Sequence, residues 1–328
     1  MVVRSDKKIT ILDLIKSRKD DNSVFGERKD AYKLGLVVEG GGMRGTVCAG
    51  SVALMEELDI RNVFDAYYAV SAGTPATVCY LTGQAKTGLA FYYNNLARGN
   101  LVKLTEIFRG KPVLKLGSLI EQITSQAMID YEQIIGKHSQ VNFFATHAQT
   151  GAVTRMDVSS PEKILQAMYY SCFVPLAAGL PDENQLLDGG LSTTGIPIQQ
   201  ALEDGCTHVL CLLTRPIGKG RKLTMTDRFT SMALRIKKYP IAAQQCLSLS
   251  SSYNKTVEYI IRNSNFGMDS SPIIEFIAPS SSDREVKPHE QNPHKLYQGA
   301  VSGFVSARNY FGQHHISEEI IPGIVKFN

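Results

Sequence analysis

The sequence predicts an α/β fold with a largely parallel central sheet. Short apolar runs alternate along the chain with segments of helical periodicity, and such alternation is typical of strands joined by helical crossovers. The first run, residues 34–38, is apolar at consecutive positions, as expected of a strand that is buried on both faces. The composition agrees, because 43% hydrophobic and 20% charged residues in a chain of 328 are typical of a globular protein. These fractions exclude general disorder, collagen and a coiled coil.

The predicted elements follow one another in the order that a parallel sheet requires. A charged lead-in over residues 1–33 contains one short helix around residues 9–15. Buried strands are predicted at residues 34–38, 66–70, 141–146, 207–213 and 273–277. Helices are predicted after the first two strands and at residues 161–171, 196–204, 224–238, 241–263 and 294–311. The chain has no internal repeat and no low-complexity linker, so we expect one domain with helical additions in its C-terminal third.

Charge and cysteine usage exclude several kinds of protein. The net charge is only +4, which is weaker than the basic surface of a nucleic-acid-binding domain. The 6 Cys lie far apart, without a CxxC pair or the spacing of a zinc site, so we expect buried thiols and no metal or cofactor. No secretory signal peptide precedes the first strand, and no apolar run reaches the ~18 residues of a membrane span. We therefore expect a cytoplasmic protein that meets a membrane only at its surface.

A glycine-rich loop follows the first strand and precedes a helix. Its residues are Gly40, Gly41, Gly42, Met43, Arg44 and Gly45. Backbone N–H groups at a helix N-terminus stabilise negative charge. The loop is therefore suited to the pyrophosphate of a dinucleotide or to the oxyanion of an acyl-transfer reaction.

The second strand ends on a serine, and this favours acyl transfer. A dinucleotide-binding unit needs an acidic residue near the end of that strand, whereas Asp59 and Asp65 come too early. Ser71 directly follows the strand instead, within the pentapeptide of residues 69–73. This pentapeptide is a G-x-S-x-G nucleophile elbow in which Ala69 replaces the first glycine. A serine between small residues is also a common helix N-cap, but its place after a buried strand and a glycine-rich loop favours a nucleophile.

A third motif, Asp188-Gly189-Gly190, supplies a carboxylate on an open turn. A serine hydroxyl is a poor nucleophile until a base takes its proton. Asp188 is a candidate for that base, and an Asx-turn is the structural alternative.

Together the three motifs resemble the patatin-like phospholipases. That family has a glycine-rich loop ending in Arg-Gly or Lys-Gly, then G-x-S-x-G, then D-G-G or D-G-A. The resemblance spans residues 34–215, and Ala69 departs from the usual glycine. It implies a three-layer α/β/α fold with a nucleophile elbow. Residues 214–216, 238–240 and 253–254 further resemble a bacterial branch of the family, which implies additional C-terminal helices. The resemblance to the family also implies hydrolysis of lipid acyl esters without a metal or cofactor.

The resemblance assigns roles to individual residues. It implies a catalytic dyad of Ser71 as nucleophile and Asp188 as general base. The implied oxyanion hole comprises Gly40, Gly41, Gly42, Met43, Arg44, Gly45 and Ala72, and the expected N–H donors are those of residues 41–43 and 72. Ala69, Gly73, Gly189 and Gly190 support the motifs. Arg44 either pairs with a carboxylate or faces a phosphate headgroup. The implied organisation is a lead-in at 1–33, a catalytic core at 34–215 and a helical extension at 216–328.

Two alternatives remain open at this point. A Ser–His–Asp esterase needs a histidine after Asp188. The histidines that follow it in the chain are His208 and, in polar segments without a supporting motif, His289, His294, His314 and His315. His208 lies inside a predicted strand, where a buried histidine of the core is the expected role. A catalytically decayed lipid-binding or scaffold protein with the same fold is the second alternative.

The weak overall charge conceals one strongly basic segment. Residues 219–238 hold seven basic side chains against one acid, Asp227. The basic side chains are Lys219, Arg221, Lys222, Arg228, Arg235, Lys237 and Lys238. Phe229, Met232, Ala233 and Ile236 recur at helical spacing. This apolar face either packs on the domain or belongs to a basic amphipathic helix that contacts anionic lipid.

Overall fold

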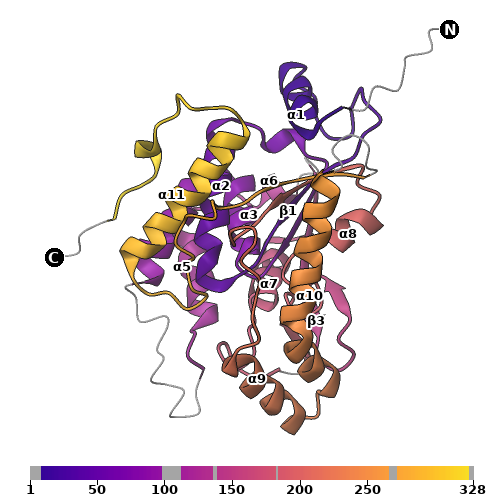
Figure 1. Ribbon diagram of the computed structural model, residues 1–328, viewed down its shortest axis with the longest axis vertical. Helices are drawn as coiled ribbons and strands as arrows, with labels where there is room; N and C mark the ends of the chain where they lie inside the picture. The colour runs from indigo at the N-terminus through magenta and orange to yellow at the C-terminus, as the bar shows by residue number, and fades with distance from the viewer. Residues whose placement is uncertain (1–8, 98–111, 136–138, 182–183, 266–271, 325–328) are drawn as a thin grey trace.

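A mostly parallel sheet forms the centre of the molecule (Figure 1). The computed structural model describes residues 9–97, 112–135, 139–181, 184–265 and 272–324. The strands are β1 Leu34–Val38, β2 Ala66–Val70, β3 Gln140–His147, β4 Val153–Arg155, β5 Leu186–Asp188, β6 His208–Leu212 and β7 Ile273–Ile277. The order is β4-β3-β2-β1-β6-β7, with β5 pairing to β3. β4 and β5 are antiparallel to β3, and the other pairings are parallel.

Helices cover both faces of this sheet. They are α1 Ile11–Asp20, α2 Gly45–Glu57, α3 Gly73–Leu81, α4 Ala85–Phe91, α5 Leu116–Gln126, α6 Glu132–Ile135, α7 Pro161–Ser171, α8 Ile198–Glu203, α9 Met225–Ile236, α10 Pro240–Asn265 and α11 Pro293–Tyr310. Alternate side chains of β1 enter different cores, because successive residues of a strand point to opposite faces. Leu36 packs in a core that includes residues of α2, α3, α7 and α11, whereas Val37 packs with residues of α8 and α10. The predicted three-layer α/β/α fold is confirmed.

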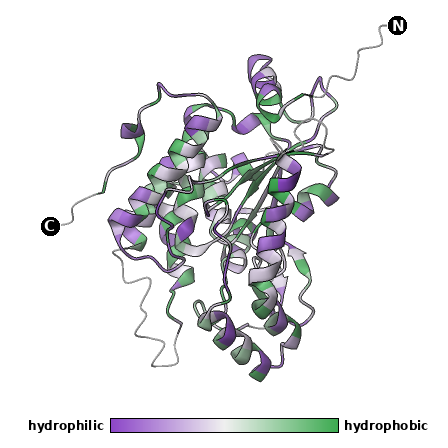
Figure 2. Ribbon diagram, in the orientation of Figure 1, coloured by the Kyte–Doolittle hydropathy of each residue, from purple (hydrophilic) through white to green (hydrophobic). Residues whose placement is uncertain are grey.

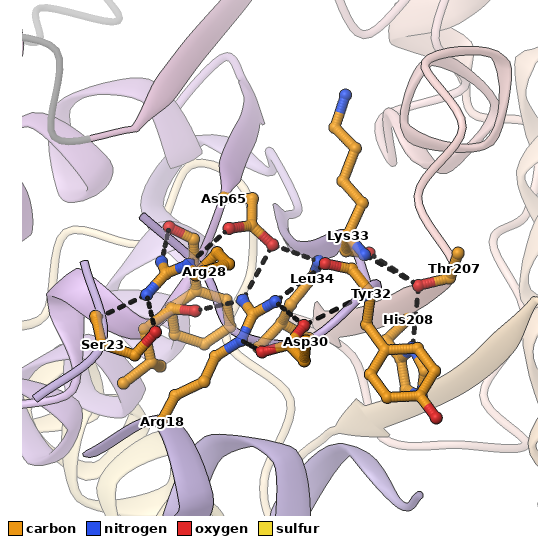
Figure 3. Close-up of polar contacts among 12 residues, drawn as sticks. Arg18, Ser23, Arg28, Asp30, Tyr32, Lys33, Leu34, Asp65, Thr207 and His208 are labelled. Carbon is orange, nitrogen blue, oxygen red and sulfur yellow. Dashed lines mark hydrogen bonds and ion pairs between the residues drawn. The ribbon is translucent and has the colours of Figure 1, made fainter. Parts of the chain in front are cut away.

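A buried ion network ties the N-terminal segment to the sheet (Figure 3). Asp65, directly before β2, accepts hydrogen bonds from Arg18 Nη1 at 2.8 Å and Arg28 Nε at 2.8 Å. It also accepts one from the Leu34 N–H at 2.7 Å. Arg18 is further paired with Asp30 at 2.8 Å. The predicted helix of the lead-in is present as α1, and the network lies where β1 and β2 begin.

Helix α11 packs closely on α2, the helix that follows the glycine-rich loop. The Thr46 hydroxyl donates to the Leu296 carbonyl at 3.1 Å, and the Ser51 hydroxyl donates to the Gly303 carbonyl at 3.0 Å. Both hydroxyls are buried. The C-terminal segment therefore supports the helix that carries the candidate oxyanion loop.

The apolar face of α9 does not pack on the rest of the domain, although this was one of the two expected arrangements. Phe229, Met232 and Ile236 are exposed, while Thr230, Ser231 and Leu234 make the buried face. The packing alternative for the apolar face is therefore wrong. Among the described residues, no helix is both long enough and apolar enough to cross a bilayer.

Candidate active site

The glycine-rich loop and Ser71 emerge side by side at the carboxyl edge of the sheet. Strands β1 and β2 are parallel neighbours with Val38 paired to Ala69, so the residues after each strand meet at the same edge. A Cβ on Gly40 would lie 2.7 Å from Ser71 Cβ and 2.8 Å from the Val70 carbonyl oxygen. Real Cβ atoms do not approach this closely, so only glycine at position 40 lets the two segments touch.

Ser71 has the strained backbone of a nucleophile elbow. Its φ is +52°, a value that residues other than glycine rarely adopt. Its N–H donates to the Ser171 hydroxyl at 2.9 Å, and its carbonyl accepts from the Thr74 N–H at 2.9 Å. The side chain is 7% exposed and stands just before the N-terminus of α3. Ala69, the departure from the family pattern, lies fully buried within β2.

Asp188 reaches the same edge from β5. This strand runs antiparallel to β3, with Asp188 opposite Ala145. The Asp188 N–H donates to the Phe173 carbonyl at 2.8 Å, and Asp188 Oδ1 accepts from the Gly190 N–H at 2.7 Å. Within the described chain, no group makes a hydrogen bond of standard geometry with Oδ2. One oxygen is therefore fixed, and the other is open to receive a proton.

Burial makes the Asp188 carboxyl a weaker acid than an ordinary aspartate. It raises the pKa of the carboxyl to about 6, while the nearby Ser71 hydroxyl and the Gly190 N–H lower the pKa by favouring the ionised form. A base whose pKa lies near the working pH is both ionised and basic enough to take a proton.

Some backbone N–H groups of the loop already donate a hydrogen bond within the protein, and others do not. The Gly40 N–H donates to Gly195 at 3.0 Å, and the Met43 N–H donates to the Pro288 carbonyl at 3.0 Å. The Arg44 N–H donates to Gly41, and the Gly45 N–H donates within the same turn. Among the described residues, nothing accepts from the N–H groups of Gly41, Gly42 or Ala72. Met43 is thus engaged elsewhere, contrary to its expected role as a donor.

Gly42 is where the loop requires glycine most strictly. Its φ is +59°, and a Cβ at this position would lie 2.6 Å from the Pro288 carbonyl oxygen. The segment around Pro288 therefore packs directly on the loop. The sequence carried no local signal for this contact, because the two positions are far apart in the chain.

A buried polar network beneath the loop was not predicted. Glu39 is fully buried, and its carboxylate accepts from the Thr214 N–H at 2.6 Å and the Tyr253 hydroxyl at 3.0 Å. The buried Arg44 donates to the Thr214 hydroxyl at 3.4 Å. Desolvation and then the nearby Arg215 lower the pKa of Arg44 to about 10, and Glu39 partly opposes this. Arg44 thus lies inside the fold, close to a carboxylate.

His208 lies at the edge of the sheet opposite Ser71. It is the first residue of β6 and pairs with Leu34, the first residue of β1. Its Nε2 bonds to the Ile9 carbonyl at 3.0 Å, and its Nδ1 bonds to the Thr207 hydroxyl at 2.9 Å. The expectation that His208 belongs to the core is confirmed, and this residue cannot complete a triad with Ser71. Within the described part of the chain, no three His, Cys, Asp or Glu side chains group as a metal site would need.

Comparison with known proteins gives one family. The model of the family described as patatin-like phospholipase matches residues 36–202. No curated protein matches the chain. Among solved structures, the chain is similar to VipD from Legionella pneumophila, with a TM-score of 0.38 and 12% identity. That match covers 87% of this chain and 67% of the other. Similarity at this level does not indicate which residues or which reaction the two proteins have in common.

Proposed function

Because the chain belongs to the patatin-like phospholipase family, we propose that it is a serine hydrolase of lipid acyl esters, with Ser71 as nucleophile and Asp188 as general base. The family supports lipid acyl hydrolysis in general. One observation supports the assignment of Ser71 as nucleophile and Asp188 as general base. The strained Ser71 and an aspartate with raised pKa and an open oxygen emerge at one edge of the sheet.

The reaction proceeds through a covalent acyl-enzyme. Asp188 Oδ2 takes the proton of Ser71 Oγ as this oxygen attacks the ester carbonyl carbon. The resulting tetrahedral oxyanion accepts hydrogen bonds from the free N–H groups of Gly41, Gly42 and Ala72. A single donor of this kind stabilises the transition state by about 2.7–4 kcal/mol. The C–O bond to the alcohol then breaks, and protonated Asp188 gives its proton to the departing oxygen.

Water completes the cycle. Asp188, ionised again, takes a proton from a water molecule that attacks the acyl carbon. A second oxyanion forms in the same hole and collapses, releasing the fatty acid and returning the proton to Ser71. Gly40, Met43, Arg44 and Gly45 hold the loop in shape, since their N–H groups are already engaged. The dyad needs no histidine.

The proposal includes peripheral contact with lipid. The basic side chains of residues 219–238 would attract the protein to an anionic surface. They are Lys219, Arg221, Lys222, Arg228, Arg235, Lys237 and Lys238.

Hydrolysis of a fluorogenic ester by wild type, Ser71→Ala and Asp188→Asn tests the dyad. Both variants should lose at least about 10³-fold in kcat, as when a member of a catalytic unit is removed. Ser251→Ala, an exposed serine on α10, is the matched control and should keep wild-type kcat. Near wild-type kcat in either dyad variant overturns the assignment. Absence of hydrolysis by the wild type, across short and long acyl esters, favours the decayed-scaffold alternative.

A further inference from the structure

Helix α9 carries an apolar stripe that no part of the described chain covers. Met225, Phe229, Met232 and Ile236 are 63%, 55%, 55% and 72% exposed, and we call these four residues the α9 stripe. Their spacing of four, three and four residues places them on one helix face. Figure 2 shows hydrophobic and hydrophilic residues together on this helix, at the lower end of the view.

The stripe stands on a well-anchored helix. A capping box joins Thr224 and Asp227 at its start, and its opposite face buries Leu234. The Tyr239 N–H donates to the Leu234 carbonyl at 2.8 Å, which fixes the turn into α10. The exposure therefore belongs to a formed helix and not to a frayed end.

This helix lies at the same edge of the sheet as the candidate active site. Helix α9 lies beside the first turns of α10 (Figure 1). In those turns, Gln245 Nε2 donates to the Gly151 carbonyl at 2.8 Å, and Gly151 follows the carboxyl end of β3. Because β3 is parallel to β2, its carboxyl end shares an edge with Ser71.

The charge around the stripe selects an anionic partner. Residues 219–238 carry seven basic side chains, and their single acid, Asp227, is already paired with Arg221 at 2.7 Å. A second copy docked stripe to stripe would bring these like charges together, which is unfavourable. An apolar face flanked by Lys and Arg is the pattern of a helix that lies in a membrane interface.

We propose that the α9 stripe inserts into the surface of an anionic bilayer and holds the catalytic edge against it. The inference rests on the proposed function, since it names the surface on which the lipid substrate is met. Two features contribute to membrane binding in this proposal. The basic side chains attract the protein to the surface, and the α9 stripe holds it there by burying apolar area.

The sequence contains no Trp, so a single introduced tryptophan reports the environment of its own position by fluorescence. F229W and M128W each introduce one tryptophan, the first on the stripe and the second at another exposed position, where Met128 is 77% exposed. Both are made in the Ser71→Ala background so that the vesicles stay intact. With vesicles of phosphatidylcholine and phosphatidylglycerol, F229W emission should shift to the blue and M128W emission should not. With phosphatidylcholine alone, both spectra should change little.

Affinity measurements complete the test. The double variant Phe229→Ser/Ile236→Ser should bind anionic vesicles at least about tenfold more weakly, because two apolar side chains no longer enter the interface. Hydrolysis of a water-soluble short-chain ester, measured with Ser71 intact, should be unchanged by this double variant. Met128→Ser is the control and should bind as the wild type does.

Two outcomes overturn the inference. One is unchanged vesicle binding by the double variant, together with an unshifted F229W spectrum. The other is a wild-type dimer that the double variant converts to a monomer without loss of vesicle binding, which identifies the stripe as a self-association face. Failure of the proposed dyad is distinguishable, because it appears as retained ester hydrolysis in Ser71→Ala whatever the vesicle result.

Discussion

The backbone N–H of Ser71 donates a hydrogen bond to the side chain of Ser171 at 2.9 Å. The same hydroxyl pairs with the Thr74 hydroxyl at 2.9 Å, and the Ser171 carbonyl accepts from the Gly189 N–H at 3.4 Å. Ser171 is fully buried at the end of α7. One residue thus contacts the elbow, the helix after it and the turn that holds Asp188.

We predict that Ser171→Ala lowers kcat by about tenfold while changing KM little. The substitution leaves the Ser71 N–H buried without an acceptor, which costs about 1–3 kcal/mol and loosens the elbow. Steady-state kinetics on a soluble ester give the answer. Ser160→Ala, which removes the N-cap at the other end of the same helix, is the control. It should lower the melting temperature and leave kcat intact; equal effects of the two variants on kcat would refute a positioning role for Ser171.

The activity should depend on pH through Asp188. Burial raises the pKa of this carboxyl to about 6, and only the ionised form accepts the Ser71 proton. The kcat/KM for a soluble ester should therefore rise as pH increases through about 6 and level off above it. A profile that stays flat between about pH 5 and 7.5 would show that Asp188 is not the base.

The same raised pKa predicts a stability cost. A carboxyl whose pKa rises from 3.8 in the unfolded chain to about 6 in the fold destabilises the fold when ionised, here by about 3 kcal/mol. The cost is present above pH 6 and vanishes below about pH 4, where both states are protonated. Asp188→Asn should therefore be more resistant to urea than wild type at pH 8 and similar to it at pH 3.5. A variant less stable than wild type at pH 8 would contradict this.

Two neighbouring glycines should respond differently to substitution by alanine. Gly42→Ala places a Cβ at φ +59° and 2.6 Å from the Pro288 oxygen, so we expect at least about a tenfold loss of kcat and a lower melting temperature. Gly41 has a φ of 163°, outside the left-handed region, and the three heavy atoms nearest to a Cβ there belong to the Arg44 side chain, at 3.2–3.3 Å. Gly41→Ala should keep most of the activity. Equal losses of kcat in the two variants would show that the contact with Pro288 does not explain the requirement for glycine at position 42.

The sequence predicted the elements that local patterns define. The apolar runs at residues 34–38, 66–70 and 273–277 are strands with those bounds. The short strands β4 and β5 were missed, because three residues show no periodicity. The three motifs gave the candidate residues, but the parallel pairing of β1 with β2 and the antiparallel pairing of β5 with β3 bring them to one edge.

Contacts between distant parts of the chain could not be predicted. Ser171, Pro288 and Tyr253 touch the elbow, the loop and Glu39 from about 100 to 245 positions away, and nothing in their local sequence marks those partners. The orientation of α9 was open for a related reason. Helical spacing locates an apolar face but does not say whether that face meets the protein or its surroundings.

In the mechanism that we propose, Ser71 is a nucleophile activated by Asp188. This assignment is tested most directly by reaction with a fluorophosphonate, followed by mass spectrometry of the labelled peptide. We expect one label, on Ser71, formed at least about 100-fold more slowly in Asp188→Asn because the base is lost. Labelling of another serine, or an undiminished rate in Asp188→Asn, would contradict it.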